Sequence, residues 1–286
     1  MTKNIPCVII HKKYKPYLKL NLEITSKNNE IYLIGDNSLK FLANNKNITF
    51  IDIDKYEKSE SLNFFKKHFI NYSTNSFEFE WFCFARMFIL KEFIKEYNLE
   101  QIFYIDSDNL LLTDINEIKF KNNVAYLIPQ NQHKNRMTAS IHSSLLNSWY
   151  CNIFSDLFEQ IFVNKNKFNL IDEKINFHKE NNVKGGICDM TLHFLIYQEY
   201  KDKIQNIIFP SYSKSGEKVV FMNVFSNGEG PISKNNYLLK NNKLKIFEGN
   251  KILDIVENEK IKVCNIHYQG SSKKYLKRYT KYFLKF

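Results

Sequence analysis

The first half of the chain alternates short apolar runs with stretches that have helical spacing. Four runs are rich in β-branched or aromatic residues and too short for helices, so they are predicted to be strands: residues 7–10, 31–34, 48–53 and 102–105. Three stretches have the apolar periodicity of helices: residues 16–24, 64–70 and 77–97. This alternation predicts an α/β fold with a Rossmann-like, mostly parallel central sheet flanked by helices.

The second half has a less regular pattern. Helices are predicted over residues 144–163 and 187–200, and residues 165–182 are interpreted as a polar loop. Further strands are expected at residues 124–129, 207–209, 219–222, 238–246 and 261–266. Neither an internal repeat nor a low-complexity linker divides the sequence, which favours one continuous unit.

The strand predicted at residues 102–105 runs directly into Asp106-Ser107-Asp108. Ligands of open α/β sheets bind beyond the carboxyl ends of the strands, where these two carboxylates are expected. Carboxylates at positions i and i+2 can converge on one ion when the chain bends, and Mg²⁺ and Mn²⁺ prefer such oxygen ligands. The alternative is an ordinary polar turn, since Asp, Ser and Asn are common turn residues.

Composition narrows the class of protein. With 286 residues and 44% hydrophobic content, the chain can bury a large core. Its five cysteines are odd in number and scattered, which argues against a disulfide scaffold or zinc knuckle and for a reducing compartment. Neither a signal peptide nor a membrane-spanning run is evident, so a cytoplasmic protein is expected.

The chain is strongly basic, with a formal net charge of +11. Basic proteins attract phosphates, anionic membranes or nucleic acid. Only Arg86, Arg136 and Arg278 are arginines, however, whereas nucleic-acid readers depend on arginine for bidentate contacts. We therefore expect no nucleic-acid partner, and phosphate-bearing ligands and anionic membranes remain the candidate partners.

A second candidate group follows the predicted strand at residues 261–266. His267 beside two carboxylates would complete an oxygen and nitrogen ligand set for Mn²⁺ or Mg²⁺. Gly270 would let the backbone approach a ligand, and Lys273 would offer a point charge to a phosphate. The alternative is a strand-end histidine and a solvated lysine.

Other candidates lie elsewhere in the chain. Gly185 and Gly186 precede a predicted helix and suit close backbone approach, and Asp189 lies near the helix N-terminus, where it either faces a ligand or caps the helix. Asp36 ends the second predicted strand, where acidic residues bind ribose hydroxyls in nucleotide folds. Arg86 could pair with an acidic group or a phosphate, or form a surface salt bridge.

Two parts of the chain together resemble a known family. Residues 1–128 are similar to the nucleotide-sugar-binding half of a GT-A-fold glycosyltransferase: strand, helix, strand ending Gly-Asp, long helix with Arg, then an apolar strand into Asp-x-Asp. The segment His267-Tyr268-Gln269-Gly270-Ser271-Ser272-Lys273 resembles the His-x-x-Gly-x-x-Lys signature of family-eight-type retaining glycosyltransferases. The family's usual Pro-Trp after the lysine is Lys274-Tyr275 here.

The resemblance implies roles for particular residues. Asp106, Asp108 and His267 would hold Mn²⁺ or Mg²⁺, and Asp189 matches the acidic residue near the reacting sugar. The implied contacts to the nucleotide-sugar are Ile10, His11, Asp36, Arg86, Asp106, Ser107, Gly185, Gly186, Gly270 and Lys273. The whole chain, residues 1–286, would form one GT-A-like catalytic domain, with a nucleotide-sugar half at 1–128, an acceptor-side half at 129–272 and a basic, aromatic tail at 273–286.

The implied activity is transfer of a hexosyl or N-acetylhexosaminyl group from a UDP-sugar to a hydroxyl, with retention. The expected acceptor is a glycan or glycolipid, as in bacterial surface polysaccharide, lipooligosaccharide or capsule synthesis. The tail has the pattern of a basic amphipathic helix, which either binds the inner face of the membrane or packs on the domain. Alternatives are a sugar nucleotidyltransferase, a phosphatase-like hydrolase and a non-catalytic membrane- or glycan-binding domain.

Overall fold

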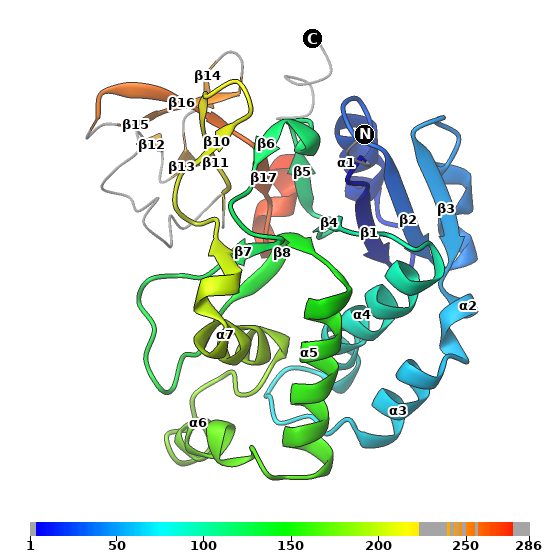
Figure 1. Cartoon of the computed structure of the whole chain (residues 1–286), viewed down its shortest axis with the longest axis vertical. Helices are drawn as coiled ribbons and strands as arrows, with labels where there is room; N and C mark the ends of the chain where they lie inside the picture. Colours follow the sequence, from blue (N-terminus) through cyan, green and yellow to red (C-terminus); the bar gives the residue numbers. More distant parts are fainter. Residues whose placement is uncertain are drawn as a thin grey trace.

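A computed structural model describes residues 4–222, 239–240, 243–244, 246–247, 250–254 and 257–276. Its main sheet has seven strands in the order β3-β2-β1-β4-β8-β7-β9 (Figure 1). They are β1 (Cys7–His11), β2 (Ile31–Gly35), β3 (Ile48–Asp52), β4 (Ile102–Ile105), β7 (Val124–Leu127), β8 (Ser140–Leu146) and β9 (Ile204–Asn206). Only β8 runs against the others. The predicted α/β class with a mostly parallel sheet is therefore confirmed.

Helices cover the main sheet (Figure 1). They are α1 (Pro16–Thr25), α2 (Asp54–Glu57), α3 (Glu60–His68), α4 (Phe77–Glu96), α5 (Ser148–Phe158), α6 (Asn169–Glu180) and α7 (Asp189–Glu199). Successive residues of β1 point to opposite faces of the sheet and so belong to different hydrophobic cores. Val8 and Ile10 pack with helices α3 to α7 on one face, and Cys7 and Ile9 pack with α1 on the other. Burial on both faces explains why β1 and β4 are unbroken apolar runs.

Smaller elements complete the described chain. A second sheet has the order β14-β15-β16-β11-β10-β6, and β5 pairs with β17 as β12 does with β13. These strands are β5 (Asn109–Leu111), β6 (Ile118–Lys119), β10 (Ser211–Ser213), β11 (Lys218–Val220), β12 (Leu239–Lys240), β13 (Lys243–Leu244), β14 (Ile246–Phe247), β15 (Lys251–Asp254), β16 (Glu259–Val263) and β17 (Asn265–His267). Short helical turns are η1 (Asn37–Leu42), η2 (Ile115–Glu117), η3 (Glu159–Val163), η4 (Lys201–Lys203) and η5 (Gly270–Tyr275).

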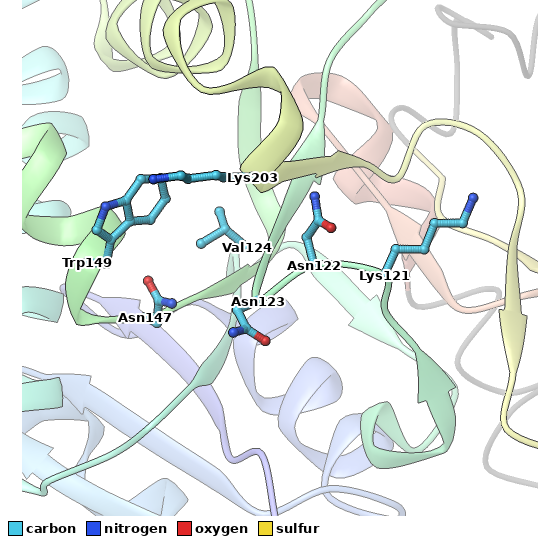
Figure 2. Close-up of a pocket in the computed structure, with 7 residues that line it drawn as sticks. All are labelled: Lys121, Asn122, Asn123, Val124, Asn147, Trp149 and Lys203. Carbon is cyan, nitrogen blue, oxygen red and sulfur yellow. The ribbon is translucent and has the colours of Figure 1, made fainter.

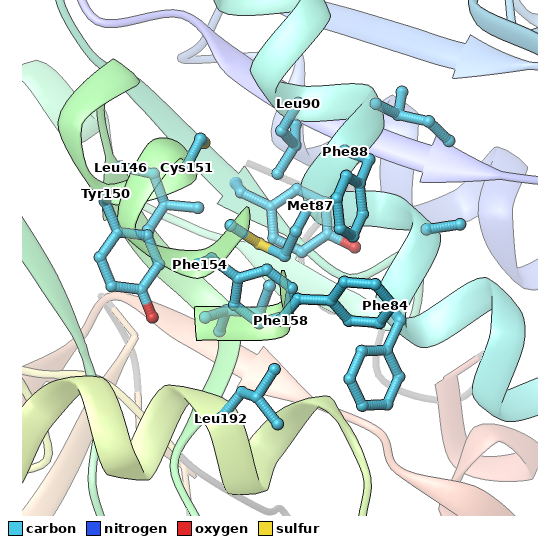
Figure 3. Close-up of a cluster of buried hydrophobic side chains, with 14 of the residues drawn as sticks. Phe84, Met87, Phe88, Leu90, Leu146, Tyr150, Cys151, Phe154, Phe158 and Leu192 are labelled. Atoms are coloured by element: carbon cyan, nitrogen blue, oxygen red, sulfur yellow. The ribbon is translucent and has the colours of Figure 1, made fainter. Parts of the chain in front are cut away.

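Helix α4 is held in place by aromatic packing against α5. Figure 3 shows Phe84, Met87 and Phe88 of this helix against Phe154 and Phe158 of α5. The rings of Phe88 and Phe158 meet edge to face with centroids 5.3 Å apart. Such pairs contribute about 1 kcal/mol beyond the area they bury. The helix therefore has little freedom to shift relative to the sheet.

The strand order reverses beside β1. The chain winds outward through β2 and β3 and then returns to place β4 on the other side of β1. Ligands of doubly wound sheets bind at such a switch point, beyond the carboxyl ends of the strands. The Asp106-Ser107-Asp108 turn follows β4 at this position.

Buried amides hold that turn in place. The side chain of Asn21 in α1 donates to the carbonyls of Ser107 (2.8 Å) and Asn109 (3.0 Å). It also accepts a hydrogen bond from the Thr25 hydroxyl at 2.7 Å. Both polar atoms of this fully buried side-chain amide, Nδ2 and Oδ1, are thus engaged in hydrogen bonds, which tie α1 to the turn.

Three predictions of secondary structure were wrong. The first residues of the helix predicted at 144–163 belong to β8, and α5 begins only at Ser148. The loop predicted at 165–182 contains α6, whose buried Ile171 and Ile175 have helical i,i+4 spacing. The strand predicted at 207–209 is displaced to β9, and Ile207 and Ile208 are core residues in the turn after it.

Two other expectations concern segments that the structure describes only in part. The tail predicted to bind membrane is described only as far as residue 276, and the strand predicted at 238–246 only in part. Among the helices of the described chain, none combines the length and the apolar composition needed to cross a bilayer.

The amides around the Asp106-Ser107-Asp108 turn generate a stability prediction. Asn21→Leu leaves the carbonyls of Ser107 and Asn109 buried without donors, so it should lower the free energy of unfolding by about 3 kcal/mol. Urea denaturation measures this loss. The exposed Asn28, whose side chain donates to Leu112 O at 3.4 Å, provides the control. An equal loss in Asn28→Leu would show that the buried amide has no special role.

Candidate active site

A cavity of about 320 Å³ opens beyond the carboxyl end of β4. Both halves of the chain build its wall, and the contributing segments are residues 73–86 with α4, 106–108, 140–142 of β8, 185–190 and 267–273. Most of the predicted site residues lie in this wall. Its size and its convergent polar groups are typical of a small-ligand site.

The predicted metal ligands are brought together by the pairing of β5 with β17. This antiparallel pair places His267 opposite Asn109, next to the turn that carries Asp108. Asp106, Asp108 and His267 each offer one ligand atom, and these atoms lie within 4.8 Å of one another. His267 Nε2 lies 3.4 Å from Asp108 Oδ1.

This donor set fits a divalent ion. Two carboxylates and an imidazole match the oxygen-rich preference of Mn²⁺ and Mg²⁺. Tyr104 and Arg86 both donate to Asp106 Oδ1, at 2.8 and 2.5 Å. Among the described residues none donates to its Oδ2, which leaves that oxygen available to an ion.

Lys273 contributes positive charge to the same place. Its Nζ lies 2.9 Å from Asp108 Oδ2, and it comes from η5, which follows His267 by three residues. Burial alone would raise the pKa of Asp108, but the hydrogen bond and charge of His267 and the charge of Lys273 outweigh it and lower the pKa. Asp108 is therefore ionised and ready to bind a cation.

Arg86 joins the two sides of the cavity. Its guanidinium donates to Asp106 Oδ1 at 2.5 Å and to Asp189 Oδ2 at 2.8 Å, and only 12% of its side chain is exposed. Burial lowers the pKa of Arg86, but Asp106 and the other acidic neighbours more than compensate and hold it above its ordinary value. This bridge fixes the spacing between the metal-ligand turn and Asp189.

Asp189 is the first residue of α7 and lies almost fully buried. Its Oδ1 accepts a hydrogen bond from Met190 N at 2.9 Å, as expected near a helix N-terminus. Burial raises the pKa of Asp189, and Arg86 opposes this rise. Helix capping and a role in the cavity are therefore both compatible with its position.

Gly185 and Gly186 shape the wall beside Asp189. Both have positive φ, 120° and 127°. A Cβ on Gly186 would lie 2.2 Å from the Tyr72 carbonyl oxygen, because this segment pairs with residues 72–74. Gly186 is thus required for close approach of two backbone segments, whether or not a ligand binds there, while a Cβ on Gly185 would meet the ring of His178.

Four predicted nucleotide contacts lie outside the cavity wall. Ile10 is a core residue of β1, and Ser107 uses its carbonyl to accept from Asn21. Asp36 accepts from Lys13 N at 2.5 Å and caps η1 through Ser38 N. The electrostatic neighbours of His11 include Asp108 and Lys273, and burial lowers its pKa. Their proposed contacts with a nucleotide stay predictions.

Sequence reasoning missed several polar residues of the wall, among them His142 and Glu80. The ring of His142 in β8 stacks on His267, with centroids 4.0 Å apart. Glu80 is fully buried, and its Oε2 has no hydrogen-bond partner within the described chain. A signal for Glu80 was present, because Glu80, Cys83 and Arg86 recur every three residues on an otherwise apolar face of α4. The pattern of β8 gave no comparable signal for His142.

A larger hollow lies elsewhere on the surface. It measures about 420 Å³ and is drawn in Figure 2. Its lining consists of Lys121, Asn122, Asn123, Val124, Asn147, Trp149 and Lys203. It contains neither a carboxylate nor a histidine nor a thiol, so the smaller cavity is the better candidate for chemistry.

No protein-family model matches the chain, and no curated protein matches it in sequence. Three solved structures are similar at low level. The PaToxG glycosyltransferase has a TM-score of 0.43 and 13% identity, covering 69% of this chain and 70% of its own. The glycosyltransferase GlyE of Streptococcus pneumoniae TIGR4 has a TM-score of 0.38 and 15% identity, covering 71% of this chain and 45% of its own.

The third structure is a glycosyltransferase involved in glycosylation of the major capsid of PBCV-1. It has a TM-score of 0.40 and 8% identity, and the match covers 97% of this chain and 99% of its own. These TM-scores are too low to establish either a shared fold or a shared activity. The functional argument therefore depends on the residues of the cavity.

Glu80 generates a prediction about pH. Burial raises its pKa, the hydrogen bond from Asn75 opposes the rise, and the charge of Asp189 adds to it. The unfolded chain releases this proton at lower pH than the folded chain, so the group destabilises the fold as pH rises above the ordinary carboxyl range. The difference between the melting temperatures of Glu80→Gln and wild type should therefore shift by a few degrees in favour of the variant between acidic and neutral pH.

Differential scanning fluorimetry across that pH range measures the trend. Glu78→Gln, an exposed neighbour in the first turn of the same helix, is the control and should show no trend. A flat difference for Glu80→Gln would mean that its carboxyl is not perturbed.

Proposed function

We propose that this chain is a metal-dependent glycosyltransferase that uses a UDP-sugar donor. The observation that supports it best is the gathering of Asp106, Asp108 and His267 in one cavity at the carboxyl end of the sheet. These groups come from the middle and the far end of the chain, as the two sequence motifs predict. Lys273 and Asp189 lie in the wall of the same cavity.

The donor diphosphate would be bound by positive charge. Asp106, Asp108 and His267 would hold Mn²⁺ or Mg²⁺, which when bound supplies Lewis-acid stabilisation for a departing diphosphate. Lys273 places a second positive charge beside the metal ligands, 2.9 Å from Asp108. Negative charge that develops on the leaving group would thus meet fixed cations of the chain.

Asp189 is the proposed catalytic residue on the sugar side. In the reaction, the acceptor oxygen bonds to the anomeric carbon while the bond from that carbon to the UDP oxygen breaks. With retention, Asp189 orients the sugar or stabilises its positive charge, and the hydroxyl proton leaves with the diphosphate. With inversion, Asp189 takes that proton as general base. The anomeric configuration of the product, measured by proton NMR, distinguishes the two.

The acceptor is proposed to be a glycan or glycolipid hydroxyl of a surface polysaccharide, reached at the inner face of a membrane. The sequence pattern of the tail at 273–286 supports this location. A sugar nucleotidyltransferase is the nearest rival, but residues 11–15 are His-Lys-Lys-Tyr-Lys and lack the glycines of a phosphate loop.

The proposal predicts metal-dependent release of UDP. The wild-type protein should release UDP from at least one UDP-sugar with Mn²⁺ and not with EDTA. Asp108→Asn should lower the rate by more than about a hundredfold, because metal stabilisation of a leaving group is worth several kcal/mol. Asp202→Asn, an exposed site outside the cavity, serves as the matched control.

Thermal shift adds a readout that is independent of turnover. Mn²⁺ with UDP should raise the melting temperature of the wild type and of Asp202→Asn but not of Asp108→Asn, since a ligand that binds only the folded state stabilises it. Release of pyrophosphate from a sugar phosphate and UTP would favour the nucleotidyltransferase. Undiminished UDP release by Asp108→Asn would defeat the metal assignment.

A further inference from the structure

Phe79 is an unusual member of the cavity wall. Its exposure of 58% is the largest among the exposed large hydrophobic residues of the described chain. It nevertheless lines the cavity that holds Asp106, Asp108 and Asp189. A single exposed apolar side chain is common on a protein surface, so it is the place of Phe79 in the wall of a polar cavity that singles it out.

Its neighbour Phe77 provides an internal comparison. Phe77 is 50% exposed, but its ring packs against Phe69 with centroids 5.5 Å apart, and it is not part of the cavity wall. Phe79 makes no ring contact of this kind with any residue that the structure describes. Two similar side chains on one helical turn therefore differ in what they face, and only Phe79 presents an unpartnered ring to the cavity.

Helix α4 sets the distance between this ring and the charged groups. The Ser76 side chain caps the helix by accepting from Phe79 N, which fixes Phe79 in the first turn. A helix rises about 1.5 Å per residue, so Arg86 lies roughly 10 Å further along the axis. Exposure falls in the same direction, to 12% for the Arg86 side chain. The exposed ring is thus at the outer end of the cavity, which we call the mouth, and Arg86 with its partner Asp189 is at the inner end.

Polar groups flank the ring at the mouth. Ser73 and Asn75 line the same wall, and they come from the loop just before α4. Asn75 uses one amide hydrogen on Glu80 Oε1, at 2.6 Å, and has further donor and acceptor capacity. The mouth therefore combines an apolar face with hydroxyl and amide groups at its edge.

We propose that Phe79 is the stacking platform for a pyranose ring of the acceptor, and this inference rests on the proposed function. A pyranose has an apolar C–H face and hydroxyls around its edge, which match the ring and its flanking Ser73 and Asn75. The C–H face buries apolar area on the aromatic ring while the hydroxyls keep hydrogen-bond partners. A purely apolar ligand would leave these polar groups without partners.

The test compares Phe79→Ala, Phe79→Tyr and Phe77→Ala with wild type, each first shown by circular dichroism to be folded. The UDP-sugar that the wild type hydrolyses with Mn²⁺ is the donor. Methyl α- and β-glycosides of glucose, galactose and N-acetylglucosamine are the acceptor probes, and acceleration of UDP release identifies the best one. The rate of donor hydrolysis without acceptor tests the donor site at the inner end of the cavity. The KM for the glycoside tests acceptor binding at the mouth.

We expect KM for the best glycoside to rise about tenfold in Phe79→Ala, as loss of one stacked aromatic contact implies. Donor KM and donor hydrolysis should stay within about twofold of wild type. Phe79→Tyr should restore KM, because a tyrosine ring stacks equally well, and Phe77→Ala should match wild type.

Other outcomes overturn the inference. An unchanged glycoside KM in Phe79→Ala, or the same rise in Phe77→Ala, would show that Phe79 is not a platform. If Phe79→Ala raised the KM for the donor instead, the ring of Phe79 would contact the nucleotide-sugar and not the acceptor. Donor hydrolysis that no glycoside accelerates would show that the mouth does not take a pyranose, while the proposed function stands. Absence of any donor hydrolysis in wild type removes the proposed function itself.

Discussion

The short antiparallel pairing of β5 with β17 is the constraint on which the candidate site depends. It joins residues 109–111 to 265–267, so two segments far apart in sequence meet at the end of β4. Buried amides reinforce the joint, since Asn265 donates to Asn109 Oδ1 at 2.7 Å and Asn109 donates to His142 O at 2.6 Å. A fully satisfied buried polar network specifies one arrangement, because any slip would leave its members unpaired. His267 therefore reaches Asp108 through backbone register, not through a flexible loop.

Charge balance is the second constraint, and it couples stability to function. Asp106, Asp108, Asp189 and Glu80 all lie in one wall, and buried carboxylates are costly without partners. Arg86 and Lys273 pair with the first three, which makes the cavity stable in the absence of a ligand. The same cations are those that a diphosphate would attract. Removing Arg86 would thus deprive the buried Asp189 of its cation, and removing Lys273 would leave Asp108 with His267 alone; either change would also weaken an anion site.

The sequence predicted the main sheet and the grouping of Asp106, Asp108 and His267 better than it predicted the elements between residues 140 and 210. The unbroken apolar run at 102–105 could only be a doubly buried strand, and the two motifs placed Asp106, Asp108 and His267 in one group. The last three residues of β8 were taken for helix and its first four were not assigned, because its serines and histidine are buried by hydrogen bonds that no local pattern reveals. Helix α6 was hidden by its many exposed charges. For Glu80 the three-residue spacing on α4 was a usable signal, but its full burial comes from tertiary packing. Long-range partners decided each of these cases.

Helix α4 links packing to the geometry of the site. Its apolar side chains lock against α5 and the sheet, so the helix acts as a rigid spacer between the mouth of the cavity and Arg86 (Figure 3). A transferase needs its two substrates aligned to within fractions of an ångström, because misplacement of reacting atoms is costly in rate. Rigid elements provide that alignment better than loops do. The aromatic core behind α4 would not contact a substrate. It would nevertheless set the distance between Phe79, in the first turn of α4, and the charged groups around Arg86.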